Sequence, residues 1–222
     1  MRIELPGPSG EILRIQSLLD ALDRGLATGD VPARKYPQRR QLAVADLGRA
    51  KVAAVLEAGE KVEAEHHWCH GHFKIPASPL AETAMPAVSL YATDRRLFRW
   101  RFQDLPVPDA RVEPGEEDAE TLECIPYRAL VSVRRRAAVR WSEAGAGTLI
   151  FAAAFLARGH LAITGFALMA VGAAGVLHAL LMPTRWVDLV PGDPAEAPWP
   201  VYVARKKSAR RLLALVRGRV AP

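Results

Sequence analysis

The residues best suited to chemistry are four histidines and a cysteine within the stretch 66–72, which reads HHWCHGH. Imidazole and thiolate groups are ligands for Zn and Cu ions. On a strand, His66, His70 and His72 would project from one face and Cys69 from the other. Such a metal site, with Cys69 as a further candidate ligand, would support a metal-dependent enzyme or a redox component. The other interpretations are a polar, partly exposed strand whose histidines bind nothing, and a pH-responsive surface.

Other signatures of catalysis are missing from the sequence. It contains no glycine-rich phosphate loop, no G-x-S-x-G motif and no H-E-x-x-H motif. The two cysteines, Cys69 and Cys124, form no C-x-x-C pair, which argues against a disulfide scaffold and fits a reducing compartment. Any enzymatic activity would depend on the histidine cluster, and no cofactor is predicted besides Zn or Cu at that cluster.

The most informative element is a 39-residue apolar run, 144–182, in which Arg158 is the one fixed charge. Its second part, Leu161 to Met182, has 22 residues and would cross a hydrocarbon core of about 30 Å at roughly 1.5 Å per residue. Its first part, 144–157, has 14 residues and crosses only with interfacial flanks or a thinned bilayer. We expect a transmembrane helical hairpin over 143–183. The alternative is a buried helical hairpin inside a soluble protein.

The charges beside this run predict its orientation, because cytoplasmic segments next to membrane spans are enriched in Lys and Arg. One arginine lies in the turn, whereas five lie just outside the run: Arg134, Arg135, Arg136, Arg140 and Arg185. We therefore expect an integral protein of the inner (cytoplasmic) membrane with both termini in the cytoplasm.

Small residues recur every seven positions in the second half of the run, at Gly165, Gly172 and Ala179. On a helix they would form a ridge that lets a neighbouring helix approach closely. The pattern predicts close approach of a neighbouring helix.

The first 58 residues have helical periodicity. Apolar residues follow the helical spacing after Ser9, an N-cap candidate, and Gly25 and Gly29 can end this helix. A second helix is expected over 37–58, stopping at Gly59. The pair is suited to packing or to formation of a homo-oligomer.

After Gly59 the period changes to two, which predicts strands. The expected strands are 61–73, 87–92, 96–102, 121–127, 129–141, 184–190 and 199–204. Many short strands with turn signals favour an antiparallel sandwich or barrel. In the strand 96–102, Phe98 and Trp100 share one face, while Arg99 and Arg101 make the other face basic.

The chain is basic, with 30 Lys and Arg against 24 Asp and Glu and a pI of about 9.7. This charge favours a polyanionic partner or an anionic membrane surface. Nucleic-acid binding would explain the charge but not the apolar run, so no nucleic-acid partner is predicted.

The sequence of the C-terminal end predicts an amphipathic helix with Ser208 as a candidate cap. The residues expected to bind lipid headgroups are Arg134, Arg136, Arg140, Lys206, Lys207, Arg210 and Arg211.

Three short motifs in a fixed order resemble bacterial pleckstrin-homology-like (PH-like) domains. They are GEKV at 59–62, YATDRRLF at 91–98 and IPYRALVSV at 125–133, followed by the final helix. Members of that group share a GE start, a T-[DN]-x-R-L turn and an I-P-x-x-x-[IL] strand. The resemblance implies a seven-stranded bent β-sandwich closed by a C-terminal helix, with no shared catalytic residues.

The expected fold is thus α+β with a membrane insertion. An N-terminal helical hairpin would occupy 1–58, and a PH-like domain would occupy 59–142 and 184–222. The transmembrane hairpin, 143–183, would interrupt this domain between its fifth and sixth strands. Because both halves must lie on the same side of the membrane, the insertion must cross an even number of times. The expected function is a non-enzymatic module that binds a protein partner or anionic lipid headgroups, and the alternative is the metal-binding enzyme or redox component.

Overall fold

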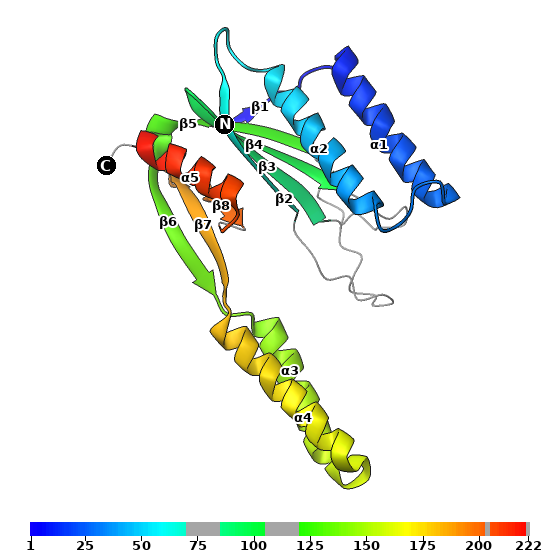
Figure 1. Cartoon of the computed structure of the whole chain (residues 1–222). Coiled ribbons are helices and arrows are strands. Elements are labelled where there is room, and N and C mark those ends of the chain that lie inside the picture. Colours follow the sequence, from blue (N-terminus) through cyan, green and yellow to red (C-terminus); the bar gives the residue numbers. More distant parts are fainter. Residues whose placement is uncertain (70–84, 105–119, 203–204, 221–222) are drawn as a thin grey trace. The chain divides into compact units, whose positions relative to one another are not determined.

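The computed structural model describes residues 1–69, 85–104, 120–202 and 205–220 of the chain. It is a mixed α/β structure with two antiparallel sheets (Figure 1). In chain order the elements are β1 (Arg2–Ile3), α1 (Gly10–Thr28), α2 (Tyr36–Ala53), β2 (Val62–Cys69), β3 (Met85–Thr93), β4 (Arg96–Asp104), β5 (Glu120–Pro126), the 3-10 turn η1 (Tyr127–Ala129), β6 (Leu130–Ala138), α3 (Trp141–Leu156), α4 (Arg158–Leu181), β7 (Thr184–Pro191), β8 (Trp199–Tyr202) and α5 (Lys207–Arg219).

The chain divides into two compact units. The first unit comprises Met1–Ser132, Pro191–Ala197 and Arg205–Pro222, and the second comprises Val133–Val190 and Pro198–Ala204. The first unit contains α1, α2, the five-stranded sheet and α5. The second contains the helix pair α3–α4 and most of the three-stranded sheet.

The sheet of the first unit has the strand order β1-β5-β4-β3-β2, and its strands are antiparallel. Tyr91 of β3 pairs with Phe98 of β4, which pairs with Cys124 of β5. Paired residues share a face, so these three side chains lie on one side of the sheet. The strands expected at 87–92, 96–102 and 121–127 are present, with ends shifted by a few residues. The strands expected at 61–73 and 199–204 are present over Val62–Cys69 and Trp199–Tyr202, and their last positions, 70–73 and 203–204, lie outside the described residues.

Helices α1 and α2 cover that side of the sheet. The Ser9 side chain caps α1 by accepting a hydrogen bond from the Ile12 amide at 3.3 Å, and Gly29 ends the helix with φ of 84°. The cap was predicted, and of the two expected end positions the helix continues through Gly25 and ends at Gly29. The second helix ends at Ala53, earlier than expected, and in the turn that follows the Glu57 amide donates to the Glu60 carboxylate at 3.0 Å.

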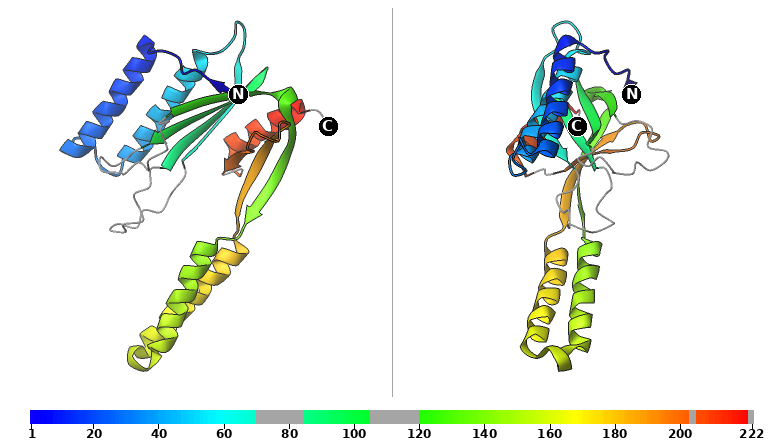
Figure 2. Two further views of the ribbon diagram at one scale, coloured as in Figure 1. Left: turned by 180° about the vertical axis from the view of Figure 1, so that it is seen from behind. Right: turned by 90° about the vertical axis from the view of Figure 1, so that its right-hand side faces the viewer.

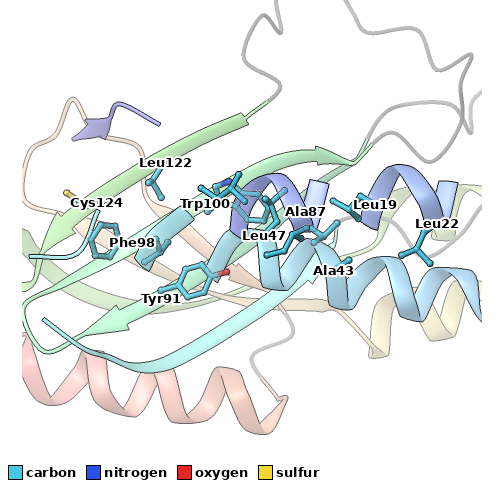
Figure 3. Packing of buried hydrophobic residues seen from close by; sticks show 14 of the residues in the cluster. Leu19, Leu22, Ala43, Leu47, Ala87, Tyr91, Phe98, Trp100, Leu122 and Cys124 are labelled. Atoms are coloured by element: carbon cyan, nitrogen blue, oxygen red, sulfur yellow. The ribbon is translucent and has the colours of Figure 1, made fainter. Parts of the chain in front are cut away.

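The core of the first unit lies between these helices and the sheet (Figure 3). Leu47 of α2 packs with Tyr91, Phe98 and Trp100, all of which are buried. Gly48 is required for this close approach, because a Cβ there would collide with the Trp100 ring and the Tyr91 hydroxyl. The first helices therefore share one core with the strands.

Helix α5 packs on the opposite side of the sheet, along β2 and β3. Its buried residues are Ala209, Leu212, Leu213 and Val216. They face the side that carries His66 and Trp68, which are also buried. The predicted C-terminal helix thus buries its apolar stripe.

In the second unit, β6, β7 and β8 are neighbours in that order, and Leu189 of β7 pairs with Trp199 of β8. Helices α3 and α4 lie side by side and run in opposite directions (Figure 2). They are connected through Ala157.

Candidate functional site

The outer surface of the helix pair α3–α4 is apolar and exposed. Within the described residues, one helix segment, Ile163–Leu181 of α4, is long and apolar enough to cross a membrane. This segment is strongly apolar, yet only 17% of its most apolar stretch is buried. Ile163 is 85% exposed and Leu156 is 82% exposed. A core helix of a soluble protein of this composition would instead be mostly covered.

The inner surface of the pair consists of small residues. On α4, Gly165, Gly172 and Ala179 are buried, as the seven-residue spacing predicted. A Cβ on Gly172 would lie 2.6 Å from the backbone nitrogen of Phe151, and one on Gly147 would lie 2.8 Å from the Gly172 carbonyl oxygen. The prediction of close helix contact is confirmed.

Polar residues connect α3 and α4 at the ends of these helices that lie next to β6 and β7. The Arg140 guanidinium contacts both oxygens of Glu143 at 3.2 Å and donates to Thr184 Oγ1 at 3.3 Å. Glu143 Oε2 lies 3.7 Å from His178 Nδ1 of α4. We call these four residues the polar clasp. The Glu143 carboxylate of α3 therefore lies beside the His178 imidazole of α4.

The second candidate surface is the basic face of α5. This name covers the bases of α5 and of the two residues before it that are exposed and contact no described carboxylate: Arg205, Lys206, Lys207, Arg210, Arg211 and Arg217. Unpaired bases on one helix favour a polyanionic partner. Four of them, Lys206, Lys207, Arg210 and Arg211, are headgroup-binding residues expected from the sequence.

Contacts at both ends attach α5 to β2. Near its start, Ser208 Oγ lies 3.0 Å from His66 Nδ1. At its end, Arg219 pairs with Glu63 at 2.7 Å and lies over the Tyr127 ring. Lys206, rather than Ser208, is the N-cap residue, because the Ser208 side chain is directed to His66.

The remaining predicted headgroup residues lie in the second unit. Arg134 and Arg136 are exposed on β6, and Arg136 pairs with Asp188 at 3.2 Å. Arg140 belongs to the polar clasp. The sequence pattern alone did not reveal these carboxylate partners.

The histidine cluster divides between two faces of β2. His66 is fully buried, stacks on Trp68 with ring centroids 5.1 Å apart and contacts Ser208. His67 lies on the other face with Nδ1 2.8 Å from Ser89 Oγ, and burial lowers the pKa of its imidazole. Cys69 is the last residue of β2, while His70 and His72 lie outside the described residues. In the described ranges, no group of three or more His, Cys, Asp or Glu could hold a metal ion.

The motifs that resemble PH-like domains meet at one corner of the first unit. Thr93 Oγ1 donates to Glu60 Oε1 at 2.7 Å, and Arg96 pairs with the same carboxylate. The Tyr127 hydroxyl donates to the Thr93 carbonyl oxygen at 2.7 Å. These contacts connect the segment before β2, the turn between β3 and β4, and η1.

Comparison of the chain with protein families, with curated proteins and with solved structures found no match.

Proposed function

We propose that this chain is a non-enzymatic integral membrane protein. The helix pair α3–α4 anchors it in the inner membrane, with both termini in the cytoplasm. The strands and α5 form a PH-like module at the cytoplasmic face, and the basic face of α5 binds anionic lipid headgroups.

One observation carries the anchoring proposal, namely the exposed apolar surface of α4. Transfer of apolar surface out of water is favourable by about 25 cal/mol per Å², so a helix with Ile163, Phe166 and Leu177 exposed needs a covering. A bilayer supplies that covering on all sides at once. The arginines at 134–136, 140 and 185 support a cytoplasmic location for both flanks.

The order of elements supports the PH-like assignment. Four antiparallel strands, β2 to β5, precede the three strands β6 to β8, and α5 follows. The insertion of α3 and α4 falls between β6 and β7, the fifth and sixth strands of that series. Seven strands followed by a helix are what the resemblance implies, whereas the insertion and the additional strand β1 depart from it.

The choice of ligand rests on charge and on location. The basic face of α5 has no described acidic partner, and an anchored chain lies next to anionic headgroups. Each base near such a surface contributes about 1 kcal/mol. A protein partner is the remaining candidate if the headgroups are not bound.

Fractionation of the full chain tests the anchor. We expect the protein to stay in the membrane fraction after carbonate extraction and to need detergent for release. Recovery of the full-length monomer in the soluble fraction would contradict the proposal.

Hydrogen exchange tests the headgroup site. In vesicles that contain phosphatidylserine, we expect the amides of α5 to exchange more slowly than in neutral vesicles, and the difference to vanish at high salt. Replacing Lys206, Lys207, Arg210 and Arg211 by Gln should remove the difference. The matched control replaces four exposed bases of the N-terminal region by Gln: Arg14, Arg24, Arg34 and Arg39. Slowed exchange in neither type of vesicle would favour a protein partner.

A further inference from the structure

We infer that the helix pair fits a hydrocarbon layer of about 21 Å, so that it prefers lipids with short acyl chains and thins the bilayer around it. This inference rests on the proposed anchoring function. It concerns which lipids contact the anchor, and it does not involve the headgroup site on α5.

The polar clasp marks one boundary of the apolar layer. Glu143 is 50% exposed and His178 is 58% exposed, and their side chains lie 3.7 Å apart. Placing an exposed ionisable side chain in the hydrocarbon layer is unfavourable in free energy. The hydrocarbon layer therefore begins beyond this contact on both helices. Trp141 and Leu181 then lie among the headgroups, and tryptophan is common at that depth.

Arg158 marks the other boundary. It is exposed at the connection between the helices, and its guanidinium lies 4.1 Å from the centre of the Phe155 ring. This contact keeps the charged group beside the last turn of α3. The hydrocarbon layer must therefore end close to Arg158.

The shorter helix, α3, limits the distance between these boundaries. On α3, the 14 residues 144–157 span about 21 Å at roughly 1.5 Å per residue. On α4, the 19 residues 159–177 lie between Arg158 and His178 and would span up to about 28 Å, so this helix is longer than the distance that α3 allows. An ordinary hydrocarbon core is about 30 Å thick. Tilting would shorten the span further, so the bilayer must adapt to the protein.

The test uses the full chain in vesicles that contain brominated phosphatidylcholines with chains of about 14, 18 or 22 carbons. Brominated chains quench tryptophan fluorescence on contact. Trp141 is 73% exposed beside the helix pair, and the difference from a Trp141→Phe variant isolates its signal. We expect the shortest chains to bind about threefold or more tightly than the longest. Equal binding, or preference for the longest chains, would overturn the inference.

A second variant moves the boundary. Glu143→Leu combined with His178→Leu makes the clasp level apolar and lengthens the apolar span by about one turn, roughly 5 Å. The preferred chain length should rise in this double variant and stay unchanged in Ile163→Val, a control at an exposed apolar site. An unchanged preference in the double variant would contradict the inference. Loss of the protein from carbonate-washed vesicles would instead contradict the anchoring proposal.

Discussion

Glu60 and Arg96 form a two-pronged ion pair at the corner between the start of β2 and the start of β4. Arg96 Nε donates to Glu60 Oε1 at 3.1 Å and Nη2 donates to Oε2 at 2.9 Å. The Glu60 side chain is fully buried, and Thr93 donates a third hydrogen bond to it. Two separate motifs, the GE start and the T-D-x-R-L turn, are therefore parts of one structural contact.

Breaking this pair should be costly. We expect Arg96→Met to lower the free energy of unfolding by about 3–5 kcal/mol, because it leaves the buried Glu60 carboxylate without its charge partner. Arg95→Gln is the matched control. Arg95 pairs with Glu57, but both side chains are about half exposed, so the loss should be about 1 kcal/mol or less. Thermal unfolding of the detergent-solubilised full chain measures both variants, and equal losses would contradict the account.

The same contact predicts a dependence on pH. Burial alone would raise the pKa of Glu60, but hydrogen bonds from Arg96, the Glu57 amide and Thr93 outweigh burial and hold the pKa below its ordinary value of 4.5. Glu60 therefore stabilises the fold above about pH 4.5, and this contribution is lost as the pH falls through the lowered pKa. Stability should fall less steeply below pH 4.5 in Glu60→Gln than in the wild type. Exposed Glu4→Gln should keep the wild-type slope.

His66 should act as a core residue that holds α5. We expect His66→Ala to cost about 2 kcal/mol or more, because it leaves a cavity beside Trp68 and removes the contact to Ser208. Ser208→Ala should cost about 1 kcal/mol. Melting curves with and without added Zn²⁺ provide the control. If Zn²⁺ raised the melting temperature of the wild type but not of His66→Ala, His66 would be a metal ligand instead.

Close packing between α3 and α4 should tolerate no side chain at Gly172. We expect Gly172→Val to destabilise the helix pair by about 1–3 kcal/mol, since the new atoms would collide with the backbone of Phe151. Ala174→Val, at an exposed position on the same helix, is the control. Protease sensitivity of the detergent-solubilised protein measures the opening of the pair. Similar sensitivity of the two variants would contradict the observed interface.

Local sequence patterns were sufficient to predict much of the fold. Alternation predicted β3 and β4, and the seven-residue spacing of Gly165, Gly172 and Ala179 identified the buried ridge of α4. These features depend on residues close together in the sequence, whose period is imposed by the strand or helix itself.

Contacts between distant residues could not be predicted in this way. Ser208 has the local context of a cap, but its side chain contacts His66, which is 142 positions away. Arg99 looked like part of a basic face, but the register pairs it with Glu123 of β5, and their side chains form an ion pair. Single-strand periodicity contains no information about what the neighbouring strand or helix places opposite.

The most direct test of the central claim is lipid contact along the helix pair. The full chain would be reconstituted in vesicles that carry a photoreactive group at the end of the acyl chain, and the labelled residues mapped by mass spectrometry. We predict labelling of exposed apolar residues of the pair, such as Leu149, Phe155 and Phe166. Leu13, Leu18 and Leu42, which are exposed on α1 and α2, should stay unlabelled. Equal labelling of the two groups, or none on the pair, would contradict a membrane anchor.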